Sequence, residues 1–103
     1  MNLFNIPGIP TPPAEELVTI LAQSPHTKIE RIVSCGHTTD WYDQDQAEFV
    51  TILQGEGELT YADGSTQRLK TGDTAIIPPH KKHRVSYTST TPPCIWLCVF
   101  YPV

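Results

Sequence analysis

Short runs of alternating apolar and polar residues fill the chain from residue 27 to its end. Turn-forming residues separate these runs at close intervals, which is typical of a sandwich or small barrel of β-strands and not of strands that alternate with helices. We therefore expect an all-β fold, with strands at residues 28–34, 38–43, 47–54, 57–62, 66–69, 74–77, 83–88 and 94–101.

Glycines mark the turns between several of these strands. Asp63-Gly64 is the two-residue signal of a tight hairpin, and the stretch from Lys70 to Asp73 is a second turn. Gly55 and Gly57 bracket a corner between two strands. A positive φ angle or a β-bulge is expected at that corner, because glycine tolerates both.

The N-terminal part of the chain differs from the rest. Residues 1–13 contain four prolines, which prevent a regular helix, together with several apolar side chains. We expect this stretch to form an arm that packs on its own barrel or on a neighbouring molecule. The chain then divides into residues 1–26, an arm and helix packed on the barrel, and residues 27–103, the β-barrel domain.

A short helix is predicted over residues 13–23. Leu17, Ile20 and Leu21 recur at i, i+3 and i+4, a spacing that places them on one face of a helix. Thr11 is a suitable N-cap residue, because its hydroxyl can accept from the first free backbone N–H groups.

The last predicted strand, residues 94–101, is apolar on both faces. Alternation places Trp96 and Phe100 on one face, and Leu97 and Val99 on the other. A strand that is apolar on both sides is normally covered on both sides. One face would line the barrel interior. The arm, the helix or a second subunit would cover the other, and we favour a homodimer, with the arm alone as the alternative.

Length and charge exclude some classes of protein. A chain of 103 residues is one domain, and its net charge of −4 gives no basic surface for nucleic acid. No apolar run approaches the length of a membrane span, and the N-terminus does not resemble a signal peptide. Three cysteines, an odd number without C-x-x-C spacing, fit a reduced, cytoplasmic setting.

Two residues suggest chemistry at strand ends. Glu48 stands near the start of one predicted strand, with six residues between it and Gly55, and His83 follows Gly72 and Pro78 at the start of another. A carboxylate and an imidazole are both common ligands of divalent metal ions. The sequence therefore suggests a site, provided that the two side chains meet in space.

These positions resemble the two conserved motifs of the cupin superfamily. The stretch E-F-V-T-I-L-Q-G, residues 48–55, is similar to the end of the first motif, G-x5-H-x-H-x3–4-E-x6-G. The stretch G-D-T-A-I-I-P-P-H-K-K-H, residues 72–83, is similar to the second, G-x5-P-x-G-x2-H-x3-N. The resemblance covers residues 28–101 in outline and is strongest to small single-domain cupins. It implies a double-stranded β-helix, or jelly-roll, barrel whose two motifs converge at its mouth.

The chain departs from the family pattern at several ligand positions. The two histidines of the first motif fall at Trp41 and Asp43, and the turn glycine of the second motif falls at His80. Only Glu48 and His83 therefore match the metal ligands of the family by position. Asp43 is a chemically valid substitute, because a carboxylate can bind a divalent ion.

His37 lies just before the predicted strand at 38–43 and can complete the set. We therefore expect a divalent metal ion held by Glu48 and His83, which match the family by position, with His37 and Asp43 completing the set. Two imidazole nitrogens and two carboxylates suit iron, manganese, zinc or nickel without distinguishing them.

Aromatic residues near these positions are candidates for contact with a small-molecule ligand. An aromatic ring that points into the barrel offers a stacking surface, although plain core packing is the alternative for each. The candidate ligand-binding residues are Trp41, Tyr42, Tyr61, His80 and Tyr87.

Three functions are compatible with the sequence. The first is a metal-dependent enzyme that acts on a small molecule in the barrel mouth. The second is a non-catalytic small-molecule-binding cupin, with or without a metal ion, which the incomplete first motif favours. The third is a structural dimer. The fold alone does not choose among them, because barrels of this kind host many activities.

Overall fold

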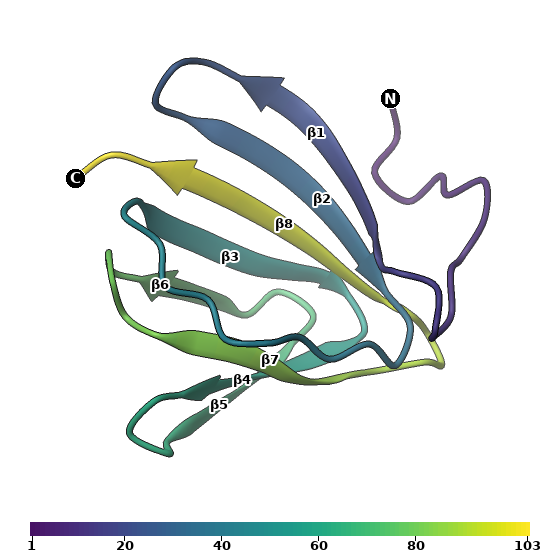
Figure 1. Cartoon of the computed structure of the whole chain (residues 1–103). Helices are drawn as coiled ribbons and strands as arrows, with labels where there is room; N and C mark the ends of the chain where they lie inside the picture. Colours follow the sequence, from purple (N-terminus) through teal and green to yellow (C-terminus); the bar gives the residue numbers. More distant parts are fainter.

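Eight β-strands and no helix make up the protein, in a computed structural model that describes all 103 residues. The strands are β1 Leu17–Gln23, β2 Lys28–Ser34, β3 Ala47–Gln54, β4 Glu56–Tyr61, β5 Thr66–Lys70, β6 Thr74–Ile77, β7 His83–Thr88 and β8 Cys94–Tyr101. They form a five-stranded sheet of order β1-β2-β8-β3-β6 and a three-stranded sheet of order β5-β4-β7, with all pairs antiparallel. The two sheets face each other as a jelly roll (Figure 1).

The strands of the barrel confirm most of the sequence prediction. β2, β3, β6, β7 and β8 have the predicted bounds. β4 differs by one residue at each end, and β5 by one residue at its C-terminal end. The predicted turns are also present, because Gly64 and Gly72 both have a φ of 88°. The predicted strand at 38–43 is wrong: only an isolated bridge joins Tyr42 to His83, and the surrounding segment runs beside β7 as a loop.

The predicted helix at 13–23 is also wrong, because residues 17–23 form the edge strand β1. β1 pairs with β2 from Leu17↔Val33 to Gln23↔Lys28, and the register shifts between Ile20 and Ala22. This bulge adds one residue to the strand, so that the two-residue alternation slips and imitates helical spacing. Three consecutive β-branched residues, Val18 to Ile20, favour the extended form.

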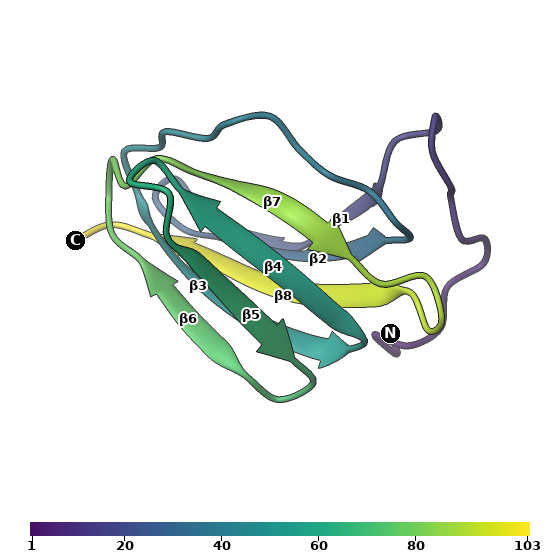
Figure 2. The same cartoon turned by 90° about the horizontal axis from the view of Figure 1, so that it is seen from below.

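The core lies between the two sheets, and strand register determines which side chains reach it. Trp96 on β8 pairs with Ile32 on β2 and Ile52 on β3, so these three side chains share the inner face. Leu59 and Tyr61 on β4 belong to the same core cluster, and Figure 2 shows β4 lying across from β3 and β8. A Cβ at Gly57 would lie 2.5 Å from the Trp96 ring, so glycine there leaves the space that the indole fills.

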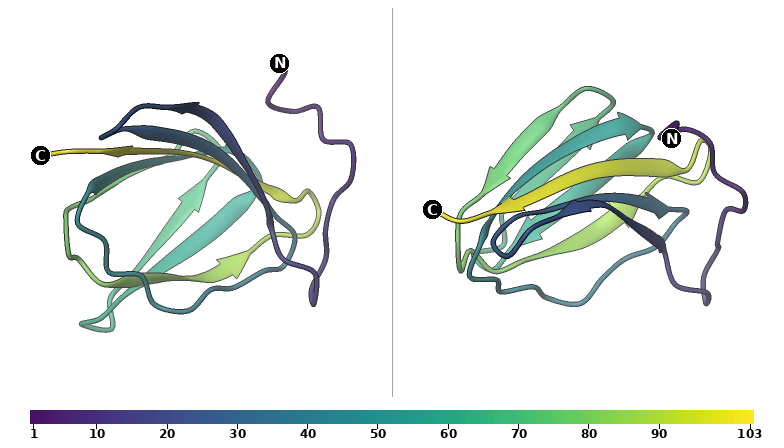
Figure 3. Two further views of the ribbon diagram at one scale, coloured as in Figure 1. Left: turned by 45° about the horizontal axis from the view of Figure 1, so that its top comes forward. Right: turned by 90° about the horizontal axis from the view of Figure 1, so that it is seen from above.

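The outer face of the five-stranded sheet is covered unevenly. Arg31, only 2 % exposed, donates from Nη1 to the carbonyls of Leu3 and Asn5, and this holds the N-terminal arm near β1 (Figure 3). The arm thus packs on its own barrel at this point. Further along the same face Ile76 stays 58 % exposed. No helix long and apolar enough to span a membrane is present.

Candidate functional site

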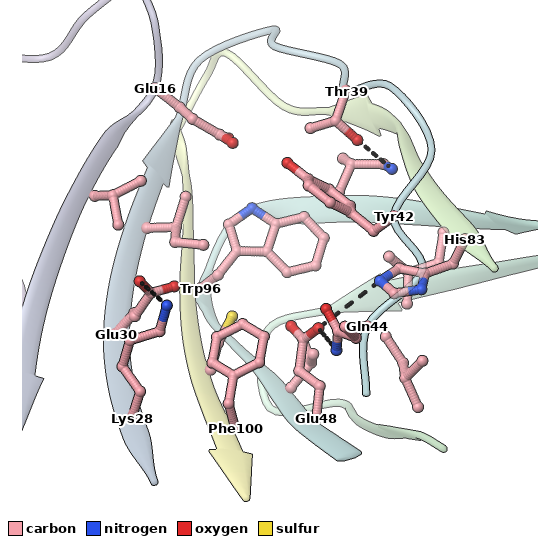
Figure 4. A pocket seen from close by; sticks show the side chains of 17 residues that line it. Glu16, Lys28, Glu30, Thr39, Tyr42, Gln44, Glu48, His83, Trp96 and Phe100 are labelled. Carbon is pink, nitrogen blue, oxygen red and sulfur yellow. Dashed lines mark hydrogen bonds and ion pairs between the residues drawn. The ribbon is translucent and has the colours of Figure 1, made fainter. Parts of the chain in front are cut away.

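A cavity of about 330 Å³ opens between the two sheets. Its walls are mainly apolar and come from both sheets, with Trp96 and Phe100 of β8 as the largest surfaces. Polar side chains lie at its two ends, as Figure 4 shows: Glu16 on one side, and Glu48, Gln44 and His83 on the other. An apolar cavity with a few converging polar groups is the usual form of a small-molecule site.

Glu48 and His83 meet in this cavity. Glu48 comes from β3 and His83 from β7, and Oε1 of Glu48 lies 3.7 Å from Nε2 of His83. This separation exceeds a direct hydrogen bond, so each group remains able to contact a bound molecule. His83 is only 3 % exposed and Glu48 8 % exposed, which keeps bulk water away from both.

Neighbouring groups fix the orientation of the pair. Nδ1 of His83 lies 2.8 Å from the carbonyl oxygen of Lys81, so Nδ1–H donates and the neutral ring carries its lone pair on Nε2. Nε2 makes no hydrogen bond within the protein and faces the cavity. Gln44 donates from Nε2 to Oε1 of Glu48 at 3.0 Å. The Tyr42 ring lies 5.7 Å from the His83 ring, centroid to centroid, and covers it.

Burial changes the acidity of Glu48. Desolvation raises the pKa of its carboxyl group above the usual 4.5, and Glu30 adds to this effect. Hydrogen bonds from Gln44 and Cys98 and the nearby His83 oppose it only in part. A carboxyl group with a raised pKa beside an imidazole is the arrangement that general acid–base catalysis uses.

The other two predicted metal ligands lie elsewhere. His37 accepts from the Cys35 backbone N–H at Nδ1 (2.8 Å) and donates from Nε2 to the Ala14 carbonyl (2.7 Å), so both ring nitrogens are occupied. Its role is to fasten the end of the arm to the loop after β2. Asp43 turns to the surface, where Oδ1 lies 2.8 Å from Nδ1 of His80.

Of the predicted ligand-contacting residues, only Tyr42 lines the cavity. Tyr61 is buried in the core and donates its hydroxyl to Gln67. Trp41 lies exposed near two basic side chains, and the Tyr87 ring stacks under Arg68 at 4.1 Å. His80 has a φ of 61° at the position where the cupin motif has glycine, so it occupies a left-handed turn at the surface.

Sequence reasoning missed several residues that line the cavity. Lys28 and Glu30 both lie on the inner face of β2. The alternation that predicted this strand already placed them on the same face, because they are two residues apart. Phe100 follows the same rule on β8. Glu16 was missed because the sequence predicted a helix there, whereas Glu16 directly precedes strand β1 and lines the cavity.

Zinc sites in proteins have three or four protein ligands. The cavity brings together one imidazole and one carboxylate at this end, with the Gln44 amide beside them. No three His, Cys, Asp or Glu side chains in the chain lie close enough to hold a metal ion. The donor set therefore does not fit the four-ligand metal site that the cupin motifs imply.

Comparison with known proteins agrees with the fold. The family model described as "Cupin domain" matches residues 33–100. A crystal structure from Ralstonia eutropha JMP134, provisionally assigned as a mannose-6-phosphate isomerase, is 31% identical, with a TM-score of 0.88 over 100% of this chain and 97% of that one. No curated protein matches the sequence.

Two more distant structures share the same barrel. A cupin superfamily protein from Desulfitobacterium hafniense DCB-2 is 23% identical, with a TM-score of 0.76 over 92% of this chain and 84% of that one. A protein with a double-stranded β-helix domain from Klebsiella pneumoniae subsp. pneumoniae MGH 78578 is 21% identical, with a TM-score of 0.77 over 91% and 83% of the two chains. Motif spacing, jelly-roll topology and the family match lead to one conclusion: the chain belongs to the cupin family, as a small single-domain member.

Proposed function

We propose that the protein is a small-molecule enzyme that moves protons within its barrel cavity, with Glu48 and His83 as the acting pair. The observation that carries the proposal is the separation of 3.7 Å between their facing atoms, inside a largely apolar cavity. One ligand atom that lies beside the pair can contact both groups.

The two residues have different roles in this proposal. His83 acts as the base, because its Nδ1–H is held by the Lys81 carbonyl and the lone pair on Nε2 points to the cavity. Glu48 acts as the acid, because burial raises its pKa and favours the protonated form. His83 takes a proton from carbon beside a carbonyl group, and Glu48 gives one to the carbonyl oxygen. Such proton transfers typically contribute about 10²–10⁴-fold to a rate.

The similar protein from Ralstonia eutropha supports a reaction of this type, since isomerisation of a sugar moves a hydrogen between carbons and proton transfer is one route for it. The substrate of that protein fits this cavity poorly. A phosphate group requires several cationic or N–H donors. The only lysine that lines the cavity, Lys28, is paired with Glu30 at 3.3 Å.

The metal ion expected from the cupin motifs is not part of the proposed mechanism. Glu48 and His83 alone leave most of a metal's coordination to water, which argues for weak binding. Metal content after purification without added metal tests this directly. A stoichiometric metal ion that is lost in His83→Gln would favour the metal-dependent enzyme instead.

The homodimer expected from the last strand also remains a proposal. On the outer face of the sheet, Leu97 of β8 is paired with Arg31 and Val99 with Phe49. The N-terminal arm contacts this face at Arg31. Val99 and Ile76 continue the uncovered part of this apolar face. A second copy would cover it, and sedimentation equilibrium of the wild type and of Ile76→Glu tests whether it does.

Hydrogen–deuterium exchange at carbon tests the catalytic proposal without a known substrate. Small carbonyl compounds are incubated with the protein in D₂O, and loss of the signal of the hydrogen beside the carbonyl is followed by NMR. We expect exchange with the wild type, a loss of about 10²-fold or more in His83→Gln, and no loss in Tyr87→Phe, which lies outside the cavity. Binding without exchange for any compound would favour the non-catalytic cupin.

A further inference from the structure

The charges that line the cavity are mostly negative. Three carboxyl groups, Glu16, Glu30 and Glu48, contribute to its wall, against one lysine. Glu48 is not counted in this charge, because burial raises its pKa and favours the protonated form. Lys28 lies 3.3 Å from Glu30 and is neutralised by it. Glu16 accepts only the hydroxyl of Ser34, at 2.7 Å, and has no cationic partner. The end of the cavity at Glu16 therefore carries a negative charge that nothing in the protein balances.

Aromatic rings lie beside this charge. Trp96 lies in the middle of the cavity wall, with Glu16 on one side of it and the Tyr42 ring on the other, as Figure 4 shows. The face of an aromatic ring attracts a cation. The cavity already contains one such contact, because Nζ of Lys28 lies 4.9 Å from the centre of the Phe100 ring.

The raised pKa values of three groups in and near the cavity agree with a negative electrostatic potential there. Burial first, and then the charge of Glu16, raise the pKa of the Tyr42 hydroxyl. Burial and the charge of Glu48 raise the pKa of Tyr61. The Cys98 thiol, at the base of the cavity, has its pKa raised by burial and by Glu48, Glu30 and Glu16. All these charged neighbours are carboxylates.

A second polar feature lies at the other end of the cavity. His83 is 3 % exposed, and its Nε2 faces the cavity at 3.7 Å from Oε1 of Glu48 and makes no hydrogen bond within the protein. An atom of a bound molecule that lies beside the two groups can be within hydrogen-bond distance of both.

We propose that the molecule bound here carries a compact organic cation, such as an alkylammonium group, seated on the Trp96 ring next to Glu16. This inference rests on the proposed function and names its substrate class. The cationic group would lie at the Glu16 end, and the part of the molecule that exchanges protons would lie between Glu48 and His83. A phosphorylated or carboxylated ligand would meet uncompensated negative charge and would be rejected.

Three compounds of equal shape and different charge test the inference. Choline carries the cation, 3,3-dimethylbutan-1-ol is its neutral carbon isostere, and 3,3-dimethylbutanoate is a similar anion. The indole N–H signal of Trp96 is followed in ¹H–¹⁵N NMR titrations of each compound. We expect choline to bind at least about tenfold more tightly than the alcohol, as a desolvated cation–π contact predicts, and the anion to bind most weakly.

Two variants assign the charge selection to one residue. Glu16→Gln should weaken choline binding several-fold and leave the alcohol unchanged. Glu15→Gln removes the same charge from the neighbouring position, which does not line this cavity, and should change neither.

The inference is overturned if the alcohol or the anion binds as tightly as choline, if none of the three binds, or if Glu15→Gln matches Glu16→Gln. Its failure is separate from that of the proposed function. If His83-dependent proton exchange occurs only with neutral carbonyl compounds, the cation inference is wrong and the proposed function stands. If choline binds selectively but proton exchange persists in His83→Gln, the assignment of the acid–base pair is wrong and the cation inference stands.

Discussion

Nε2 of His83 and Oε1 of Glu48 lie 3.7 Å apart, although 34 residues separate them in the chain and they come from opposite sheets. A second contact orients each side chain: Nδ1 of His83 donates to the Lys81 carbonyl, and Oε1 of Glu48 accepts from the Gln44 amide. The barrel thus positions two proton-carrying groups without help from a third ionisable residue. This is the relationship on which the proposed chemistry depends.

Replacing Glu48 with glutamine should stabilise the protein at neutral pH. The folded pKa of Glu48 is raised above its usual 4.5, so the folded state binds the proton more tightly than the unfolded state. The resulting stability is fully present below about pH 4.5 and is lost as the pH rises through the folded pKa. Glutamine at position 48 cannot ionise, so the variant does not lose this stability at neutral pH, and its side-chain oxygen can still accept the hydrogen bond from Gln44.

Thermal unfolding of both proteins between pH 4 and pH 8 checks this prediction. We expect the midpoint of Glu48→Gln to exceed that of the wild type at pH 7, and the two to converge towards pH 4. Glu15→Gln, an exposed carboxylate, is the matched control. Equal pH dependence of Glu48→Gln and the wild type would mean that the carboxyl group is not perturbed.

The protein should be less stable with alanine at position 80 than with glycine. Its φ of 61° is unfavourable for any residue with a Cβ, and the penalty is about 1 kcal/mol. Both substitutions lose the exposed contact with Asp43, so the difference between them isolates the backbone term. Urea denaturation should show His80→Gly more stable than His80→Ala by about 1 kcal/mol. If His80→Ala were the more stable of the two, the left-handed conformation would be wrong.

Loss of Arg31 should release the N-terminal arm. Its guanidinium group is buried, pairs only with neutral oxygen atoms, and has an Nε without a partner. Arg31→Gln is expected to cost about 1–3 kcal/mol, because the carbonyls of the arm lose their donor. Hydrogen-exchange mass spectrometry should detect faster exchange in residues 1–10, with unchanged protection in β3. Unchanged protection of the arm would show that other contacts hold it.

Adding one methyl group at Gly57 should disturb the barrel. A Cβ there would lie 2.5 Å from two atoms of the Trp96 ring, which is too rigid to yield at its tip. Gly57→Ala is expected to cost about 1–3 kcal/mol in the free energy of unfolding. Gly8→Ala, where nothing lies within 4 Å, is the control. A second substitution, Trp96→Phe, should recover part of the loss, which a double-mutant cycle measures.

The sequence predicted the barrel well where local signals agree with tertiary pairing. The alternation in 28–34 and 94–101 and the glycines at 64 and 72 each specify one structure. The N-terminal strand was missed because its bulge distorts the alternation, and because pairing with β2 outweighs a weak helical preference.

The candidate site was less predictable than the fold. Motif spacing placed Glu48 and His83 on strands, and strand register brings them to one cavity. His37 and Asp43 lie in the connection between β2 and β3, where no period relates one side chain to the next. Their directions depend on contacts with Ala14 and His80, which lie far away in the chain.

Gly57 and Trp96 sit across the barrel from each other, and the absent side chain of one makes space for the indole of the other. Neither residue can change size alone without a clash or an empty volume. In the evolutionary history of this barrel the two positions should therefore have changed together, with a large side chain at one position accompanied by a small one at the other.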